Sequence, residues 1–168
     1  MTTDLRISTE RLRLRPIAPE DFPYWLDFFA TEHSQYVGGP LSEEEAWYRI
    51  AGLIGHWAMN GYGHWSVETP DGEYLGRTGL DQPAGWDEPE LGWSFMAAAG
   101  GKGYATEAAK SVLVHERARL GKTGVVSYIK TDNAPFISLA ERMGAFHDKA
   151  TIAPWPDYLV YRHPEAQA

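Results

Sequence analysis

A glycine-rich turn, from Gly100 to Gly103, is the part of this sequence whose residue types most directly suggest chemistry. Its glycines lack side chains that would keep a ligand away from the peptide N–H groups. Lys102 adds a positive charge. A helix that begins just after such a turn offers unpaired N–H groups and the positive end of its dipole. The turn therefore predicts a site for a phosphate or pyrophosphate, with a tight turn that binds nothing as the alternative.

The elements on either side of the turn are predicted to be a strand and a helix. Leu91, Trp93 and Phe95 alternate with other residue types, which is the two-residue period of a half-buried strand. From Ala105 onward, apolar residues recur at three- and four-residue spacing, and this helical stripe should end near Gly121. The glycines thus join a strand to the start of a helix.

Two phosphate-binding motifs can be compared with these residues. A P-loop requires Gly-Lys followed by Ser or Thr, but Lys102 is followed by Gly103. A dinucleotide-binding fingerprint would use Gly101 and Gly103, yet Thr106 stands where its third glycine belongs. That motif also expects repeated strand-helix-strand units, and the sequence before Pro89 does not supply them. Neither motif accounts for the turn.

The run GGKGYATEA, preceded by an ELGW strand, resembles the acetyl-CoA-binding core of the GNAT N-acetyltransferases. The branch that it resembles most is the RimJ/RimL type, which acetylates the N-termini of ribosomal proteins. Gly103, Tyr104 and Ala105 match the second half of the family core, whereas Gly100 stands where the family has Gln or Arg. The resemblance extends from TERLRLRPI to DNAPFISLAERMGAF. It implies acetyl-CoA as acyl donor, a primary amine as acceptor (a protein N-terminal α-amine or a small molecule), and no metal.

The resemblance also implies a fold and a set of cofactor contacts. The sheet of this family splays at its two central strands, and acetyl-CoA lies in the resulting gap. Backbone groups at the end of the first arm would bind the pantetheine, and the turn with the helix start would bind the pyrophosphate. The asparagine at the end of the second arm would contact the pantetheine or cap the next helix. The residues expected to bind the cofactor are Phe95, Met96, Gly101, Lys102, Gly103, Tyr104, Ala105, Thr106, Asn133 and Phe136.

Acetyl transfer needs a base for the amine and stabilisation of the leaving thiolate. Glu90, at the start of the central strand, is the candidate base, with a structural carboxylate as the alternative. In the ribosomal branch a serine lies beside the cofactor sulfur, and this chain has Phe136 there. Ser138 is the nearest hydroxyl, although two residues farther along a helix it should point away from Phe136. A catalytically weak acyl-CoA-binding sensor is therefore the alternative function.

The acceptor site is predicted from aromatic and acidic residues. Tyr36 and Trp65 are expected to line it, and Trp47, Trp86 and Trp93 are further candidates, with a place in the core as the alternative for each. The acidic run Glu43 to Glu45 either attracts a cationic amine or only favours the start of a helix.

Composition limits the remaining possibilities. With 168 residues the chain suits one domain over 1–168, with a core from about 8 to 163. It contains no cysteine, which excludes disulfides and a cysteine-acyl intermediate, so direct transfer is the simplest route. Its net charge of -8 disfavours nucleic acid as a partner. We find no signal peptide or membrane-spanning stretch, and expect a cytoplasmic monomer or homodimer.

The order of elements predicts an α+β fold with a mixed, mostly antiparallel sheet flanked by helices. A strand ends at Pro16, and helices begin near Pro19 and at the Ser42-x-x-Glu45 capping box. After the central helix a buried strand should follow, and then a helix capped by Asp132 or Asn133. Strands are expected over 62–69, 74–81, 124–130, 145–150 and 158–162, and a loose tail over 164–168.

Overall fold

The computed structural model describes residues 5–165, and these form a mixed eight-stranded sheet in the order β1-β2-β3-β4-β5-β6-β8-β7. All neighbouring strands are antiparallel except β5 and β6. The strands are β1 (Ile7–Ser8), β2 (Arg13–Pro16), β3 (His64–Glu68), β4 (Tyr74–Asp81), β5 (Glu90–Phe95), β6 (Val125–Lys130), β7 (Phe146–His147) and β8 (Tyr158–His163). The helices are η1 (Pro19–Asp21), α1 (Phe22–Phe29), η2 (Glu32–Val37), α2 (Glu43–Asn60), η3 (Ala97–Ala99), α3 (Tyr104–Leu120) and α4 (Ala134–Arg142).

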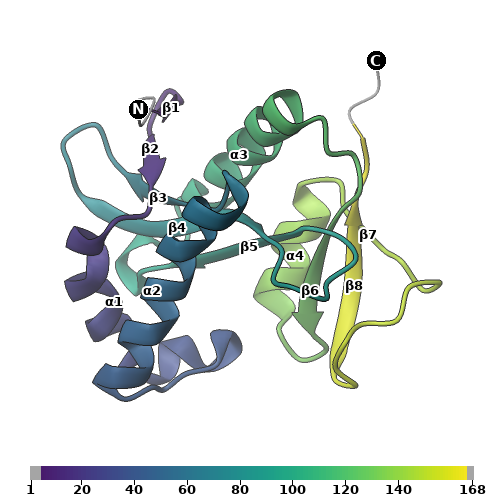
Figure 1. Ribbon diagram of the computed structural model, residues 1–168, viewed down its shortest axis with the longest axis horizontal. Coiled ribbons are helices and arrows are strands. Elements are labelled where there is room, and N and C mark those ends of the chain that lie inside the picture. The colour runs from purple at the N-terminus through teal and green to yellow at the C-terminus, as the bar shows by residue number, and fades with distance from the viewer. Residues whose placement is uncertain (1–4, 166–168) are drawn as a thin grey trace.

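The sheet opens between β5 and β6. These parallel strands share one register pair, Glu90 with Val126, whereas β4 pairs with β5 from Gly76 to Asp81. Figure 1 shows α1 and α2 at one side of the molecule and β6 and β8 at the other, with the end of β5 between them. The splay expected from the sequence is confirmed, and it places the end of β5 beside an open gap.

Two apolar cores lie on the two faces of the sheet. The alanines and valine of α3, such as Ala108 and Val112, pack in one core with Trp65 and Trp93. Helices α1 and α2 form the other core around Trp25. Because side chains alternate along a strand, Ser94, which follows Trp93 on β5, points to the α1/α2 face.

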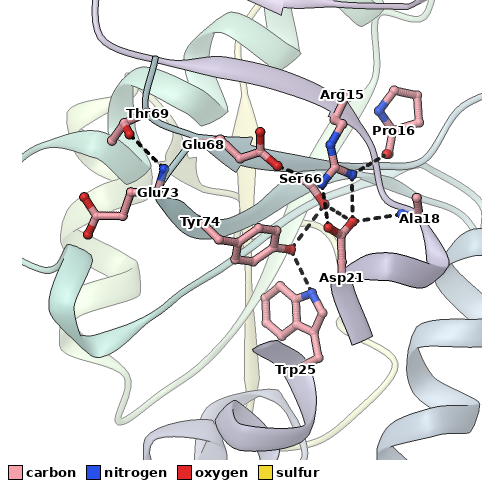
Figure 2. Close-up of polar contacts among 10 residues, drawn as sticks. All are labelled: Arg15, Pro16, Ala18, Asp21, Trp25, Ser66, Glu68, Thr69, Glu73 and Tyr74. Carbon is pink, nitrogen blue, oxygen red and sulfur yellow. Dashed lines mark hydrogen bonds and ion pairs between the residues drawn. The ribbon is translucent and has the colours of Figure 1, made fainter. Parts of the chain in front are cut away.

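A buried polar network fixes α1 to that second face (Figure 2). Arg15 donates to both oxygens of Asp21 at 2.6 and 2.9 Å, and Ser66 donates to the same carboxylate at 2.7 Å. Trp25 Nε1 donates to the hydroxyl of Tyr74 at 2.9 Å. The hydrogen bonds that Arg15 donates to Asp21 raise the pKa of Arg15, so its guanidinium stays charged at any ordinary pH. The network ties β2, β3, β4 and α1 into one rigid support.

Several local signals predict the elements correctly, and some boundaries differ. Ser42 and Glu45 form the expected capping box, and Gly121 ends α3 in the left-handed conformation. The strand predicted over 145–150 is wrong in length, because Asp148 accepts hydrogen bonds from Ala150 N and Thr151 Oγ1 and so bends the chain. Helix η2 and strand β1 were not predicted.

Within the described part of the chain, none of the helices is long and apolar enough to cross a membrane. The last three residues of the expected loose tail, 166–168, lie outside the described range.

Candidate active site

Two cavities meet where the sheet splays. One, of about 670 Å³, is lined by the glycine-rich turn and the start of α3, and we name it the glycine-turn cavity. The other, of about 410 Å³, is lined by Glu90 and by residues of β4 and β6, and we name it the carboxylate cavity. Six residues line both cavities: Tyr36, Val37, Trp93, Ser94, Asn133 and Phe136. We call the last four of these the junction.

The glycine-rich turn presents unpaired backbone donors to the first cavity. Gly101 and Gly103 have φ values of +74° and +77°, which side chains other than glycine rarely adopt. Among residues 5–165, no hydrogen bond uses the amide N–H groups of 101–106, and Glu107 N is the first to donate, to Gly103 O at 3.1 Å. Gly101 and the residues 103–106 line the cavity wall. This cluster of donors at a helix start is suited to an anion.

Lys102 is exposed and does not line this cavity, so its predicted contact with a phosphate stays a prediction. Its carbonyl instead accepts a hydrogen bond from Arg11 Nη1 at 2.9 Å. Arg11 also donates to Glu107 at 2.7 Å and lies over the ring of Tyr104. The sequence analysis missed Arg11, which joins the first strands to the turn and holds its shape.

The end of β5 lines the same cavity, but its backbone groups are already paired. Met96 N donates to Leu75 O at 2.8 Å, and Met96 O accepts from Ala99 N at 2.9 Å. The N–H group of Met96 is thus used by β4, whereas its carbonyl could still accept a second hydrogen bond, so the predicted contact of Met96 with a ligand stays a prediction. Phe95 O accepts from His33 Nε2 at 2.9 Å, so a ligand at this carbonyl must share it with the histidine.

The junction combines a helix cap, two rings and orphaned donors. Asn133 is buried, and its Oδ1 accepts from Phe136 N at 3.3 Å, so it caps α4 and also reaches both cavities. The ring of Phe136 packs on Trp93 with centroids 5.2 Å apart. Ser94 Oγ and Trp93 Nε1 are buried without a hydrogen-bond partner in the described residues. Buried polar atoms usually have partners, so the junction is suited to a polar group of a ligand.

Ser138 is not part of this site. Its side chain is exposed and lines neither cavity, as its angular offset from Phe136 around α4 requires. The predicted catalytic role of Ser138 is therefore wrong. Ser94 is the buried hydroxyl that the structure places at the junction instead.

Two carboxylates lie side by side in the carboxylate cavity. Asp81 and Glu90 are register partners on β4 and β5, and Glu90 Oε1 accepts from Tyr128 N at 3.2 Å. Burial, together with the nearby charge of Asp81, raises the pKa of Glu90 to about 7 against the opposing effects of Tyr128 N and Arg77. A carboxyl group with such a pKa can exchange protons near neutral pH, which is what a general base requires.

Buried basic groups lie on the same face of β3 and β4. Arg77 Nη1 donates to His64 Nδ1 at 2.8 Å, and burial holds the pKa of His64 well below its usual value, so the imidazole is neutral. The guanidinium lies over the ring of Trp25, 5.2 Å from its centroid. Burial also lowers the pKa of Arg77, to about 10. Arg77 thus remains a cation at neutral pH.

Aromatic side chains complete the cavity walls, though not all of those predicted. Tyr36 lines both cavities, and its hydroxyl donates to Asp132 O at 3.5 Å across the gap. Trp86 and Tyr128 pack edge to face in the wall of the carboxylate cavity. Trp65 is fully buried and donates to Glu116 at 3.0 Å. The prediction that it touches substrate is wrong, because it points to the α3 face.

The other acceptor candidates on α2 lie away from the two cavities. Trp47 is exposed on the outer surface of α2. Glu45 accepts from Ser42 N at 2.8 Å, and Glu43 and Glu44 line only a separate surface hollow. These residues start the helix, which was the alternative interpretation.

The residues that the sequence analysis missed share one pattern. Arg77, Gly79 and Asp81 alternate along β4, and opposite them on β5 stand Ser94, Gly92 and Glu90. Polar residues and glycine at every second position of otherwise apolar strands were the signal that could have found this face.

Comparisons with known proteins show the family and the fold. Residues 11–145 match the family model described as an acetyltransferase (GNAT) domain. A solved acetyltransferase from Agrobacterium tumefaciens is 32% identical, with a TM-score of 0.91 over 98% of this chain and 97% of that one. Two more distant structures share the fold. The spermidine N-acetyltransferase from Vibrio cholerae, in complex with CoA and spermine, is 16% identical (TM-score 0.72, 92% of this chain and 94% of that one). RimL, a ribosomal L7/L12 α-N-protein acetyltransferase in complex with CoA, is 18% identical (TM-score 0.73, 94% and 95%).

Proposed function

We propose that this chain, which belongs to the acetyltransferase (GNAT) family, transfers the acetyl group of acetyl-CoA directly to a primary amine as a single-domain N-acetyltransferase. The observation that carries the proposal is the meeting of two unlike cavities at one junction. The glycine-turn cavity has unpaired amide donors, and the carboxylate cavity contains Glu90 with a pKa of about 7. Such an arrangement brings an acyl donor and an amine together at the junction.

On the donor side, the pyrophosphate of acetyl-CoA would bind the amide groups of 101–106 at the start of α3. The free N–H groups and the helix dipole both favour negative charge there. The pantetheine would pass Phe95 and Asn133, and the thioester would lie at the junction. The CoA complexes named for the two distant relatives support this choice of donor.

On the acceptor side, the amine must lose a proton before it attacks the thioester carbonyl. Glu90 and Ser94 are four residues apart on β5, which is about 13 Å along a strand. The proton would therefore reach Glu90 through water. As the N–C bond forms, the C–S bond breaks and the thiolate leaves with its electron pair. We assign the stabilising hydrogen bond to Ser94, because its buried hydroxyl has no other partner in the described residues.

A second function, an acyl-CoA-binding sensor with weak catalysis, is favoured by one observation. Phe136 occupies the position of the serine in the ribosomal branch, and its ring packs on Trp93 rather than offering a donor. The sensor would bind acetyl-CoA in the same cavity without an efficient route for the thiolate.

One experiment distinguishes the transferase from the sensor. It measures the release of CoA from acetyl-CoA in the presence of a panel of polyamines, amino acids and N-terminal peptides. We expect at least one acceptor to release CoA well above the hydrolysis background and to gain the mass of one acetyl group. Binding of acetyl-CoA without acceptor-dependent CoA release over the whole panel would support the sensor instead.

A further inference from the structure

Arg77 is a buried cation that forms no ion pair within residues 5–165. Its side chain is 5% exposed, lines the carboxylate cavity, and makes its hydrogen bonds to the neutral ring of His64. Its Nε has no partner, and no carboxylate of residues 5–165 forms an ion pair with it. Buried charges in proteins are normally paired, so this guanidinium is prepared for an anion that enters the cavity.

A second arginine faces the same cavity. Arg49 extends from α2, donates to Val37 O at 2.9 Å, and likewise forms no ion pair with a carboxylate of the described residues. The charge of Arg49 lowers the pKa of Arg77, so the two cations repel each other across the cavity. An anion between them would relieve this repulsion and could accept hydrogen bonds from both.

The two arginines do not belong to the cofactor site, because neither lines the glycine-turn cavity. Arg77 is instead the register partner of Ser94, so its backbone lies one strand away from the junction. If one acceptor molecule binds these arginines through an anionic group while its amine reacts at the junction, the anionic group and the amine must be close together in that molecule. Lys130 adds a third positive charge to the carboxylate cavity. The carboxylates among the lining residues of this cavity are Asp81 and Glu90.

We propose that the acceptor is a small amine that carries a carboxylate, of the amino-acid class, and that Arg77 and Arg49 bind this carboxylate while the amine lies at the junction. This inference rests on the proposed acetyl transfer and narrows its acceptor. The carboxylate side chains of the cavity attract the ammonium group, and the arginines orient the molecule by its other end. The cavity, of about 410 Å³, has the size of a small-molecule site.

The first test compares each free amino acid with its own carboxamide, so that only the carboxylate differs. In the parent protein we expect kcat/KM for the best acid to exceed that for its amide at least about tenfold, which corresponds to about 1.4 kcal/mol. Arg77→Gln and Arg49→Gln should each reduce this ratio toward one. Arg13→Gln, which removes an exposed arginine outside both cavities, should keep the parent ratio.

The second test measures binding without turnover. N-acetyl amino acids and their carboxamides are titrated by calorimetry into the parent and the variants in the presence of CoA. The acid should bind at least about tenfold more tightly than the amide in the parent alone. Because Arg49 is exposed, its variant keeps the test valid even if Arg77→Gln does not fold.

The outcomes separate this inference from the function on which it rests. Equal binding of acid and amide by the parent, or an acid preference that survives both arginine variants, would overturn the carboxylate site. Acetylation of peptides or polyamines with no preference for a carboxylate would also overturn the carboxylate site. The proposed acetyl transfer would stand in that case. Acid-selective binding that needs both arginines, without turnover of any amine, would support the site and refute the transfer.

Discussion

At the scale of single residues, the chemistry depends on how burial changes Glu90 and Ser94. Glu90 gains basicity because its carboxylate is partly removed from water beside Asp81. The hydroxyl of Ser94 lies at the junction and has no hydrogen-bond partner among residues 5–165. Glu90 and Ser94 point to the same face of β5, because they are four positions apart and side chains on a strand alternate between its two faces.

Replacing Glu90 with Gln should lower kcat at neutral pH by about a hundredfold, because the amine loses its proton acceptor. The loss should shrink as pH rises, since the free amine then deprotonates in solution. Asp81→Asn should move the rising limb of the parent's kcat/KM profile to lower pH, because it removes the like charge that raises the pKa of Glu90. A pH-independent loss in Glu90→Gln would assign Glu90 a structural role.

The same pKa predicts an effect on stability. The pKa of Glu90 is higher in the folded protein, about 7, than its ordinary value of 4.5. The folded state therefore favours the protonated group, and this contribution is full below pH 4.5 and is lost as pH rises through 7. Relative to the parent, Glu90→Gln should thus gain unfolding free energy between pH 5 and pH 8, by roughly 1 to 3 kcal/mol. Urea unfolding of the parent and the variant at pH 5 and pH 8 measures this gain. If the difference in unfolding free energy between variant and parent were the same at both pH values, it would contradict the raised pKa.

Replacing Ser94 with Ala should lower kcat by about ten- to a hundredfold, because the leaving thiolate loses a hydrogen-bond donor. Acetyl-CoA affinity and thermal stability should stay close to the parent's, since this buried hydroxyl has no protein partner in the described residues to lose. Ser138→Ala is the matched control and should have no effect, because Ser138 is exposed away from both cavities. Full activity in Ser94→Ala would remove Ser94 from the mechanism.

At the scale of elements, β5, the glycine-rich turn and α3 act as one unit. The turn ends at Gly103, which is the N-cap of α3, and Arg11 fixes it from outside through the carbonyl of Lys102. Gly101 and the residues 103–106, whose amide groups have no hydrogen-bond partner among residues 5–165, line the cavity. Affinity for the pyrophosphate should therefore depend on the space above the turn.

A Gly101→Val variant should weaken acetyl-CoA binding by well over tenfold, because the new side chain occupies the cavity wall where the phosphate approaches. Gly121→Val is the matched control. Both glycines have positive φ and open space around the missing Cβ, but Gly121 lies at the far end of α3. The backbone strain is thus similar, whereas only Gly101 borders the cavity. Equal affinities in the two folded variants, measured by calorimetry, would argue against this phosphate site.

The sequence predicts these elements better than it predicts their side-chain partners. Periodicity, glycine positions and capping residues are local properties, so the strand-turn-helix unit and a helix cap at Asp132 or Asn133 were foreseen, and the structure has Asn133 as the cap. Trp65 was misassigned because the face of the sheet on which a strand residue lies depends on packing between distant elements. Ser138 lies away from the site, as its offset from Phe136 around the helix already indicated. Arg77 gave no local signal of its unpaired state, since that state requires the whole of β3, β4 and α1 to be in place.

At the scale of the whole molecule, the splay between β5 and β6 produces the site. A sheet that stayed paired beyond Glu90 and Val126 would leave no gap for the two cavities to meet. The resemblance to a known family predicted this opening, whereas composition and periodicity alone gave only an α+β order of elements. The polar network of Figure 2 holds α1 against the sheet and thereby supports Trp25 beneath Arg77.

The most direct test of the central claim is a crystal structure of the protein with CoA bound. Our account predicts the pyrophosphate on the amide groups of 101–106 and the sulfur at the junction, beside Ser94 and Asn133. The carboxylate cavity should remain open to an amine from the opposite side. A pyrophosphate bound elsewhere, or a sulfur outside the junction, would contradict the account.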